Sequence, residues 1–251
     1  MNLPIITAFL DQYLRIQEIG DWPGAINGLK LENGGTITKI GAAVDSTLAV
    51  IEEAIAENVD LLLVHHGLFW SGTHPITRAN YRKLKLALDH NVAVYSAHLP
   101  LDLHPECGNN AVLVRELGLG DKTEPFFFEK GQFIGLRIET KISRAELLAR
   151  LKSVLGGTPH MAAGGPEIVR EIGVVTGGAG AEIARAAAEG IDTFITGEGP
   201  HWSHGAAEEL GVNLIYGGHY ATETFGVKAL ASRIYEEFSI PWTFIDHPTG
   251  L

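Results

Sequence analysis

Residues 60–66, Asp-Leu-Leu-Leu-Val-His-His, join an unbroken apolar run to two adjacent histidines. Two further apolar runs, at residues 40–44 and 91–96, have the same character. A stretch with helical periodicity at 48–57 follows the run at 40–44, and another at 81–90 precedes the run at 91–96. Strands that are apolar at nearly every position are buried on both faces. The alternation therefore predicts a mostly parallel sheet covered by helices, with ligands bound where the strands end.

Residues of the types that bind metal ions follow these runs and a later apolar run at residues 212–216. The five candidates are His65, His66, Asp102, His219 and Glu223. Imidazole and carboxylate groups are ligands that hold Zn, Mn, Fe or Ni, and residue type alone does not select among these metals. Five ligands exceed what one tetrahedral zinc uses, so we expect two divalent ions, roughly 3.5 to 4 Å apart, that share a carboxylate.

Each of these candidates has an alternative interpretation. Adjacent residues of a strand point to opposite faces, so the two histidines meet only if the chain turns, and we expect Gly67 to allow that turn. Asp102 could instead cap a helix. His219 and Glu223, four residues apart, fit either one helical face or a turn between strand and helix. The glycines at 217–218 favour the turn.

Three further side chains are candidates for proton transfer in catalysis, namely His98, Glu198 and His204. His98 could be a direct ligand or could orient Asp102 by a hydrogen bond, and we favour the second role. Glu198 and His204 either face the metal site or belong to a solvated loop. Cys107 is isolated in the sequence, so we expect it to be buried and inert rather than nucleophilic.

The two halves of the chain resemble each other. Residues 40–70 align without a gap with residues 172–202, and residues 95–102 align with 216–223, which places one histidine and one carboxylate in each half at matching positions. Shared Ala, Ile and Gly in unrelated βαβ units is the alternative explanation. We interpret the match as a duplication, which predicts two similar three-layer α/β lobes related by a pseudo-dyad, with the metal site in the cleft between them.

His65 and His66 align with Gly197 and Glu198, so the predicted site is asymmetric. A turn-rich stretch at 117–124 separates the halves and predicts a first lobe over residues 1–124 and a second over residues 125–251.

The glycine-rich stretch at 177–180 follows a predicted strand and precedes a predicted helix, as a phosphate-binding loop does. It lacks the lysine of a P-loop and the full dinucleotide spacing, so phosphate binding there is the less favoured interpretation. Substrate specificity is expected instead from loops such as residues 71–75.

Composition excludes several classes of protein. The 251 residues include one cysteine, so no internal disulfide forms, and no apolar run approaches the roughly 20 residues of a membrane span. No leader opens the chain, so we expect a cytoplasmic protein. The net charge of −11 disfavours binding to nucleic acid. A small anionic substrate such as a nucleotide is still compatible, because bound cations invert the local potential.

On these residues the chain resembles the YbgI-type family of dinuclear metal-centre proteins, catalogued as GTP cyclohydrolase 1 type 2 homologues. The segments that carry the resemblance are Asn27-Gly-Leu29, Ala43-Val-Asp45 with Thr47, Val64-His-His-Gly-Leu-Phe-Trp70, His98-Leu-Pro-Leu-Asp102, Gly108-Asn-Asn110, Thr196-Gly-Glu198 and Gly218-His-Tyr-Ala-Thr-Glu223. The resemblance implies a two-lobed protomer, a di-metal site on the five candidate ligands, and a ring-shaped homo-hexamer with metal sites facing its interior.

Two functions follow from these observations. The first is a dinuclear-metal-dependent hydrolase, in the manner of a GTP cyclohydrolase that opens the ring of a purine nucleotide. The second is a non-catalytic metal-binding or regulatory hexamer that stores, senses or delivers metal. The first predicts turnover of a small molecule, and the second predicts exchangeable metal without turnover.

Overall fold

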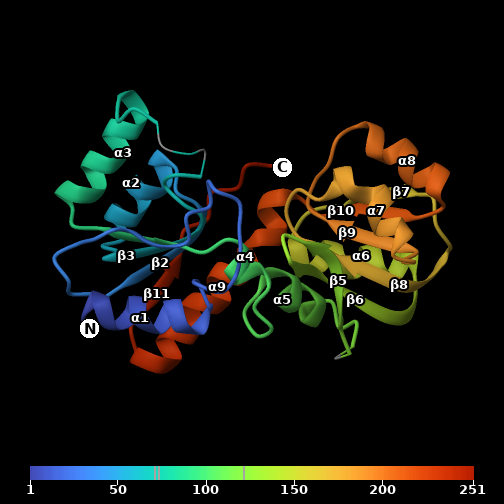
Figure 1. The fold of residues 1–251 in the computed structure, drawn as a ribbon, viewed down its shortest axis with the longest axis horizontal. Helices are drawn as coiled ribbons and strands as arrows, with labels where there is room; N and C mark the ends of the chain where they lie inside the picture. The colour runs from blue at the N-terminus through green and yellow to red at the C-terminus, as the bar shows by residue number, and fades with distance from the viewer. Residues whose placement is uncertain (71, 73, 121) are drawn as a thin grey trace. The chain divides into compact units, whose positions relative to one another are not determined.

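The computed structural model describes residues 1–70, 72, 74–120 and 122–251. It confirms the α/β class, with two separate sheets covered by helices (Figure 1). The chain forms two compact units, which we name unit 1 (residues 1–107 and 226–247) and unit 2 (residues 108–225 and 248–251). This division differs from a boundary at 124/125, because each unit includes a segment from the other half of the sequence.

Unit 1 contains a five-stranded sheet in the order β1-β4-β3-β2-β11. Its strands are β1 Gly28–Leu31, β2 Ile40–Asp45, β3 Leu61–His66, β4 Ala93–Ser96 and β11 Trp242–Phe244. Strands β2, β3 and β4 are parallel neighbours, as the three apolar runs predict, and β11 adds to β2 in parallel. The short strand β1 closes the other edge in antiparallel orientation.

Strand β3 explains why its apolar run is unbroken. Leu61 and Leu63 pack in one core cluster, whereas Leu62 and Val64 pack in another, so both faces of the strand are covered. The covering helices are α1 Leu3–Tyr13 and the later part of α9 His219–Phe238 on one face, and α2 Leu48–Ala56 and α3 Arg78–Asp89 on the other. A short helix, α4 Leu99–Asp102, follows β4.

Unit 2 contains a six-stranded sheet in the order β5-β6-β8-β9-β10-β7. Its strands are β5 Glu124–Glu129, β6 Gln132–Ser143, β7 His160–Ala163, β8 Ile168–Val174, β9 Thr193–Thr196 and β10 Asn213–Tyr216. Only β8, β9 and β10 are parallel, so this sheet is mixed. Lys130 and Gly131 both have positive φ in the two-residue turn between β5 and β6, which suits the twist of a tight hairpin.

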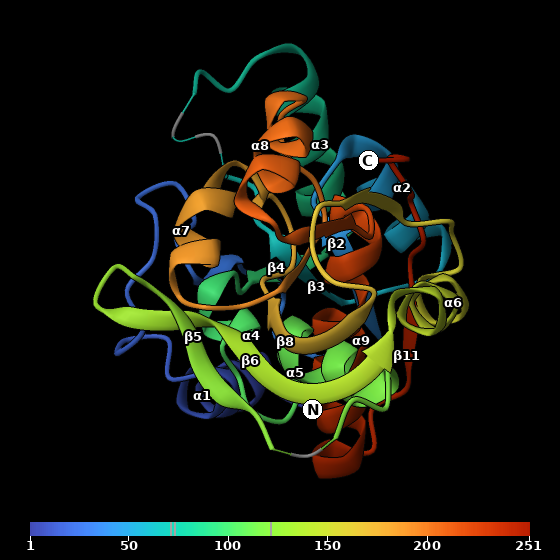
Figure 2. The ribbon, with the colours of Figure 1, turned by 90° about the vertical axis from the view of Figure 1, so that its right-hand side faces the viewer.

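Helices cover both faces of the second sheet (Figure 2). One face is covered by α5 Asn109–Glu116 and α6 Arg144–Leu155, whose Leu113, Leu147 and Leu151 are buried against it. The other is covered by α7 Ile183–Ala188, which follows the 3-10 turn η1 Gly180–Glu182, and by α8 Trp202–Leu210.

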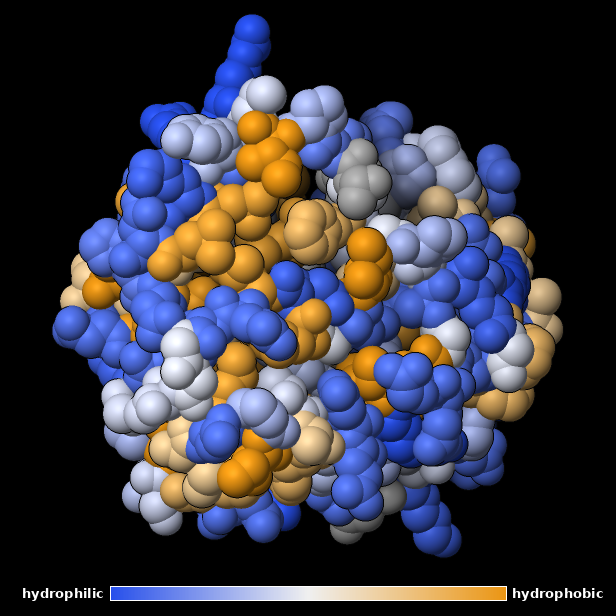
Figure 3. All heavy atoms as spheres, turned by 60° about the vertical axis from the view of Figure 1, so that its left-hand side comes forward, coloured by the Kyte–Doolittle hydropathy of each residue, from blue (hydrophilic) through white to orange (hydrophobic). Residues whose placement is uncertain are grey.

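Polar side chains cover most of the molecular face shown in Figure 3, with apolar residues gathered in patches between them. In unit 1 the large apolar side chains that reach solvent include Ile26, Trp70 and Ile76. Within the described part of the chain, every helix is too short or too polar to cross a membrane.

Candidate metal centre

The parallel strands of unit 1 bring their carboxyl ends to one edge of the sheet. Asp45 at the end of β2 lies beside His66 at the end of β3, and Val64 lies beside Ser96 at the end of β4. Residues that follow Ser96 therefore start at the same edge. The predicted ligands His65, His66 and Asp102 meet there because parallel strands in register end together.

Three histidines form a cluster at this edge. The ligand atoms of His65, His66 and His98 all lie within 4.8 Å of one another. The ring centroid of His65 is 4.8 Å from that of each of the other two. His98 was predicted to orient Asp102, but its ring belongs to the histidine cluster and is itself held by Asp21, with 2.9 Å between Nδ1 and Oδ1.

Hydrogen bonds fix the tautomer of each ring in the cluster. The Nδ1 atom of His65 lies 3.0 Å from the carbonyl oxygen of Ala97, and that of His66 lies 2.9 Å from Asp45 Oδ1. Carbonyl and carboxylate oxygens accept, so each Nδ1 donates its proton. Nε2 then carries the lone pair, which is the arrangement that orients histidine ligands in metal sites.

Asp102 lies at the end of α4 and is 8% exposed. Its Oδ2 atom is 3.6 Å from Nε2 of His65, which is the ligand atom of that ring. The N-cap positions of α4 and α5 are occupied by His98 and Gly108, so Asp102 caps neither helix. The carboxylate thus lies beside the histidine cluster, and its role as a ligand stays a prediction.

Gly67 contributes differently from the prediction. Its φ is outside the left-handed region, so it is not the permissive turn expected after His66. A Cβ atom at Gly67 would lie 2.5 Å from Ser96 Oγ. The glycine is required because β3 and β4 approach closely where the ligands begin, and both histidine rings reach the cluster from the strand itself.

Asp21 and Trp70 surround the cluster in unit 1. Burial raises the pKa of Asp21, but the hydrogen bonds and charge from His98, with donors from Asn27 and the Leu99 amide, outweigh it and lower the pKa below its usual value. The Trp70 ring lies 4.6 Å from His66 and 4.5 Å from His98. No sequence signal identified Asp21, which lies 77 residues from His98.

In unit 2, His219 is the first residue of α9, and Glu223 lies one turn later on the same helical face. The predicted turn between strand and helix is therefore wrong, because the helix begins at His219 itself. His219 Nε2 is 3.2 Å from Glu223 Oε1, and its Nδ1 is 2.8 Å from Glu198 Oε1. Burial lowers the pKa of His219, but the two glutamates outweigh it and raise the pKa to about 9.

Glu198 thus orients a candidate ligand, as Asp45 does in unit 1. The sequence leaves open whether His204 faces the metal site or a solvated loop. In the described structure its contacts are with His160, at 3.1 Å, and Glu208, at 3.6 Å. Its side chain is partly exposed on α8. Cys107 is buried, as predicted.

The glycine-rich stretch at 177–180 is explained by packing. A Cβ atom at Gly177 would overlap Glu223 Oε1, and its φ of +74° also favours glycine. The Gly177 carbonyl accepts hydrogen bonds from the amides of Gly197 and Glu198. The glycine therefore makes room for Glu223. Helix α7 begins only after an intervening 3-10 turn.

The donor set fits divalent first-row metal ions. Each candidate histidine has Nδ1 engaged and Nε2 directed to a cluster or a carboxylate, and imidazole with carboxylate suits these ions. In the loop at 71–75, expected to determine specificity, Ser71 and Thr73 lie outside the described residues.

Comparison with known proteins identifies relatives over the whole chain. The family model Duf34/NIF3 (NGG1p interacting factor 3) matches residues 1–249. A protein of Deinococcus radiodurans named GTP cyclohydrolase 1 type 2 homolog is 41% identical over 98% of this chain and 93% of its own length. A protein of Archaeoglobus fulgidus with the same name is 37% identical, with both chains covered completely.

Solved structures agree with these relationships. The chain is similar to TTHA1606 from Thermus thermophilus, with a TM-score of 0.91 and 40% identity over the full length of both chains. It is also similar to protein ybgI, described as of unknown function, with a TM-score of 0.89 and 33% identity over both full lengths. Reduced HcgD from Methanocaldococcus jannaschii has a TM-score of 0.86 and 27% identity, with 98% of each chain covered.

Proposed function

Because the chain belongs to the Duf34/NIF3 family and carries oriented histidines and carboxylates, we propose that it is a metal-dependent hydrolase with two divalent ions. The proposed ligands are His65, His66, Asp102, His219 and Glu223. The observation that carries the proposal is the shared geometry of the histidines, whose Nδ1 atoms are engaged at 2.8 to 3.0 Å. The Nε2 atoms of His65 and His219 lie 3.6 and 3.2 Å from the carboxylates of Asp102 and Glu223, which are candidate ligands themselves. Zn, Mn, Fe and Ni all suit this set.

Metal ions at such a site polarise the scissile group and lower the pKa of bound water. The chain's own residues position the reactants. Asp45 and Glu198 hold the rings of His66 and His219, and outer partners of this kind tune ligand basicity. His98, with Nδ1 on Asp21, is placed to accept or donate a proton at Nε2. Trp70 lies against the rings of His66 and His98.

The name of the relatives supplies a candidate reaction. We propose ring-opening hydrolysis of a purine nucleotide. One water attacks the imidazole-ring carbon and breaks its bond to one ring nitrogen, which leaves a formamide. A second water breaks the bond to the other nitrogen, so the carbon leaves as formate and both nitrogens take up protons. Glu198 and His98 are then the proton-transfer candidates of the reaction, and His204, which contacts His160, is the least supported of the three predicted residues.

The test is turnover by purified protein loaded separately with Zn²⁺, Mn²⁺, Fe²⁺ or Ni²⁺. GTP and a panel of nucleotides are incubated with each form, and formate and ring-opened products are measured. We expect turnover with at least one metal and loss of it in His65→Ala. Turnover of no substrate above the His65→Ala background would refute the hydrolase.

Metal that exchanges freely without any turnover would support the alternative, a metal-storing or regulatory protein. The predicted homo-hexamer is tested separately by light scattering of the metal-loaded and metal-free forms.

A further inference from the structure

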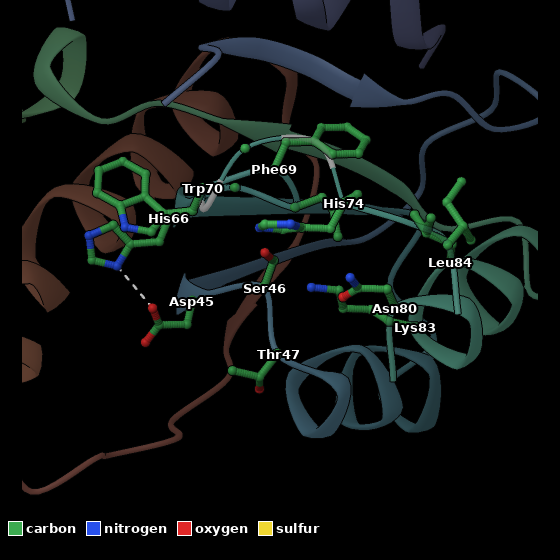
Figure 4. A pocket seen from close by; sticks show the side chains of 14 residues that line it. Asp45, Ser46, Thr47, His66, Phe69, Trp70, His74, Asn80, Lys83 and Leu84 are labelled. Carbon is green, nitrogen blue, oxygen red and sulfur yellow. Dashed lines mark hydrogen bonds and ion pairs between the residues drawn. The ribbon is translucent and has the colours of Figure 1, made fainter. Parts of the chain in front are cut away.

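A cavity of about 220 Å³ lies beside His66 in unit 1 (Figure 4). It is bounded by the end of β2, the turn after β3 and the first turns of α3. The residues that line it include Asp45, Ser46, Thr47, His66, Trp70, Asn80 and Lys83. One candidate metal ligand therefore forms part of its wall.

The polar residues that line this cavity include Asp45, Thr47, His66 and His74 as well as Ser46, Asn80 and Lys83. The last three supply donors without a partner among the described residues. Ser46 is only 6% exposed, and Asn80 and Lys83 extend from α3 on the opposite side (Figure 4). None of the three side chains forms a hydrogen bond or ion pair with any residue that the structure describes. A buried hydroxyl and a half-buried ammonium both lose favourable interactions with water, so a ligand that accepts hydrogen bonds would restore them.

Lys83 contributes an ammonium group to the cavity wall. Burial alone lowers the pKa of Lys83, without a contribution from a neighbouring carboxylate. Asp45 is the carboxylate in the cavity wall, but its Oδ1 accepts from His66 at 2.9 Å. A half-buried ammonium group in the wall of a cavity, without an ion-pair partner in the described part of the chain, favours an anion.

We propose that Ser46, Asn80 and Lys83 bind a phosphate group of a small-molecule substrate, and that His66 marks the direction of the reacting centre. This inference rests on the proposed function and deepens it by naming a substrate class. Hydroxyl, amide and ammonium donors that converge from two sides suit a tetrahedral anion with several acceptor oxygens. The cavity is smaller than pockets that enclose drug-sized ligands, so it suits the phosphate and its attached sugar rather than an entire nucleotide.

The experiment measures binding to metal-free full-length protein, so it does not depend on turnover. Inorganic phosphate, ribose 5-phosphate, ribose and acetate are titrated at constant ionic strength by calorimetry. We expect saturable binding of the two phosphate compounds only. Lys83→Met should weaken it about tenfold or more, as expected for loss of a charge-assisted hydrogen bond, and Ser46→Ala by less.

The matched control is Lys85→Met, which removes a cation from the same helix but one paired with Asp89 at the surface. It should change phosphate affinity by less than about twofold. The Lys83→Met protein should fold with an unchanged or higher melting temperature, because the change removes a half-buried charge. If the Lys83→Met protein does not fold, Lys83→Gln replaces it in the experiment.

Absence of saturable phosphate binding, or equal losses in the Lys83 and Lys85 variants, would overturn the inference. Acetate binding as tight as phosphate would overturn the phosphate assignment. A protein that binds phosphate through Lys83 but hydrolyses nothing would refute only the hydrolase, so the two failures are distinguishable.

Discussion

Units 1 and 2 build the same scaffold and use it differently. Strands β1-β4-β3-β2 of unit 1 and β7-β10-β9-β8 of unit 2 have the same order and orientation, with helices at matching places in the chain. In unit 1 the end of β3 provides the two histidine candidates and α4 provides Asp102, and Asp45 orients one of the histidines. In unit 2 the end of β9 provides the orienting Glu198, and α9 provides the ligands. The duplicated fold therefore fixes where polar groups gather, but not which position becomes a ligand.

The ladders also show a shift of one residue between the halves. Val64 pairs with Ser96, and its counterpart Thr196 pairs with Tyr216, so Tyr216 corresponds to Ser96 and not to Tyr95 as the sequences align. Successive strand residues face opposite sides. Tyr95 accordingly lies in a core cluster of unit 1, whereas Tyr216 contacts Ser203 of α8. One residue separates Ser96 from His98, whereas two glycines separate Tyr216 from His219. This extra residue compensates for the shift, so that His219 still corresponds to His98.

The largest expected effect tests the equivalence of the two cores. Leu63 and Ile195 are matching, fully buried residues, and changing either to alanine should lower the free energy of unfolding by about 2 to 5 kcal/mol. Urea denaturation followed by circular dichroism measures both. If only one of the two variants loses an amount of unfolding free energy within this range, the matching positions are not packed equivalently.

The next effect separates the two ligand sets. His65→Ala and His219→Ala should each weaken metal binding by more than the roughly 10- to 100-fold that loss of an outer partner causes. Chelator competition with elemental analysis measures affinity and stoichiometry. If both units hold the same ions, each variant lowers the total metal content. If His219→Ala leaves the stoichiometry of the ions bound by unit 1 intact, the shared dinuclear site is refuted.

Smaller effects are expected for the orienting carboxylates. Asp45→Asn in unit 1 and Glu198→Gln in unit 2 should each reduce metal affinity by roughly 10- to 100-fold, because the ring that each holds loses a charged acceptor. Asp89→Asn at the surface is the control. Equal affinities for the control and both variants would contradict the parallel between the units.

The smallest effect concerns the two tyrosines that the one-residue shift separates. Burial, reinforced by Asp11, raises the pKa of Tyr95 above its unfolded value of about 10. Its protonated form therefore stabilises the fold below pH 10, and this contribution is lost as the pH rises further. Tyr95→Phe should cost about 1 kcal/mol at neutral pH, through loss of the bond to Asp11, and should flatten the alkaline decline.

Thermal unfolding between pH 8 and pH 11 measures this slope. Tyr216→Phe is the comparison, because burial raises the pKa of Tyr216 while its bond to Ser203 lowers it, so we expect a smaller change in slope. An unchanged slope in Tyr95→Phe would contradict the expected linkage.

Much of the central scaffold could be predicted from sequence because its signals are local. The apolar runs at 40–44, 60–64 and 91–96 correspond to β2, β3 and β4, and the two periodic stretches to α2 and α3. The edges could not be predicted, because β11 joins the first sheet from the far end of the chain and its three residues have no distinctive pattern.

The candidate site was predicted in part for the same reason. His65, His66 and Asp102 follow apolar strands, which is a signal in the sequence itself. Asp45 also ends such a strand and could have been found by aligning the strand ends. Asp21 could not, because a loop far along the chain carries it to His98.

The two-sided burial of β3 also bears on which ions the first unit can accept. With leucines anchored alternately above and below the sheet, the backbone that leads to His65 has little freedom to move outward. Nitrogen donors on such a support cannot easily adapt to the bond lengths of about 2.3 to 2.6 Å, or to the oxygen-rich shell, that calcium requires. We therefore expect unit 1 to take up first-row metal ions in preference to calcium.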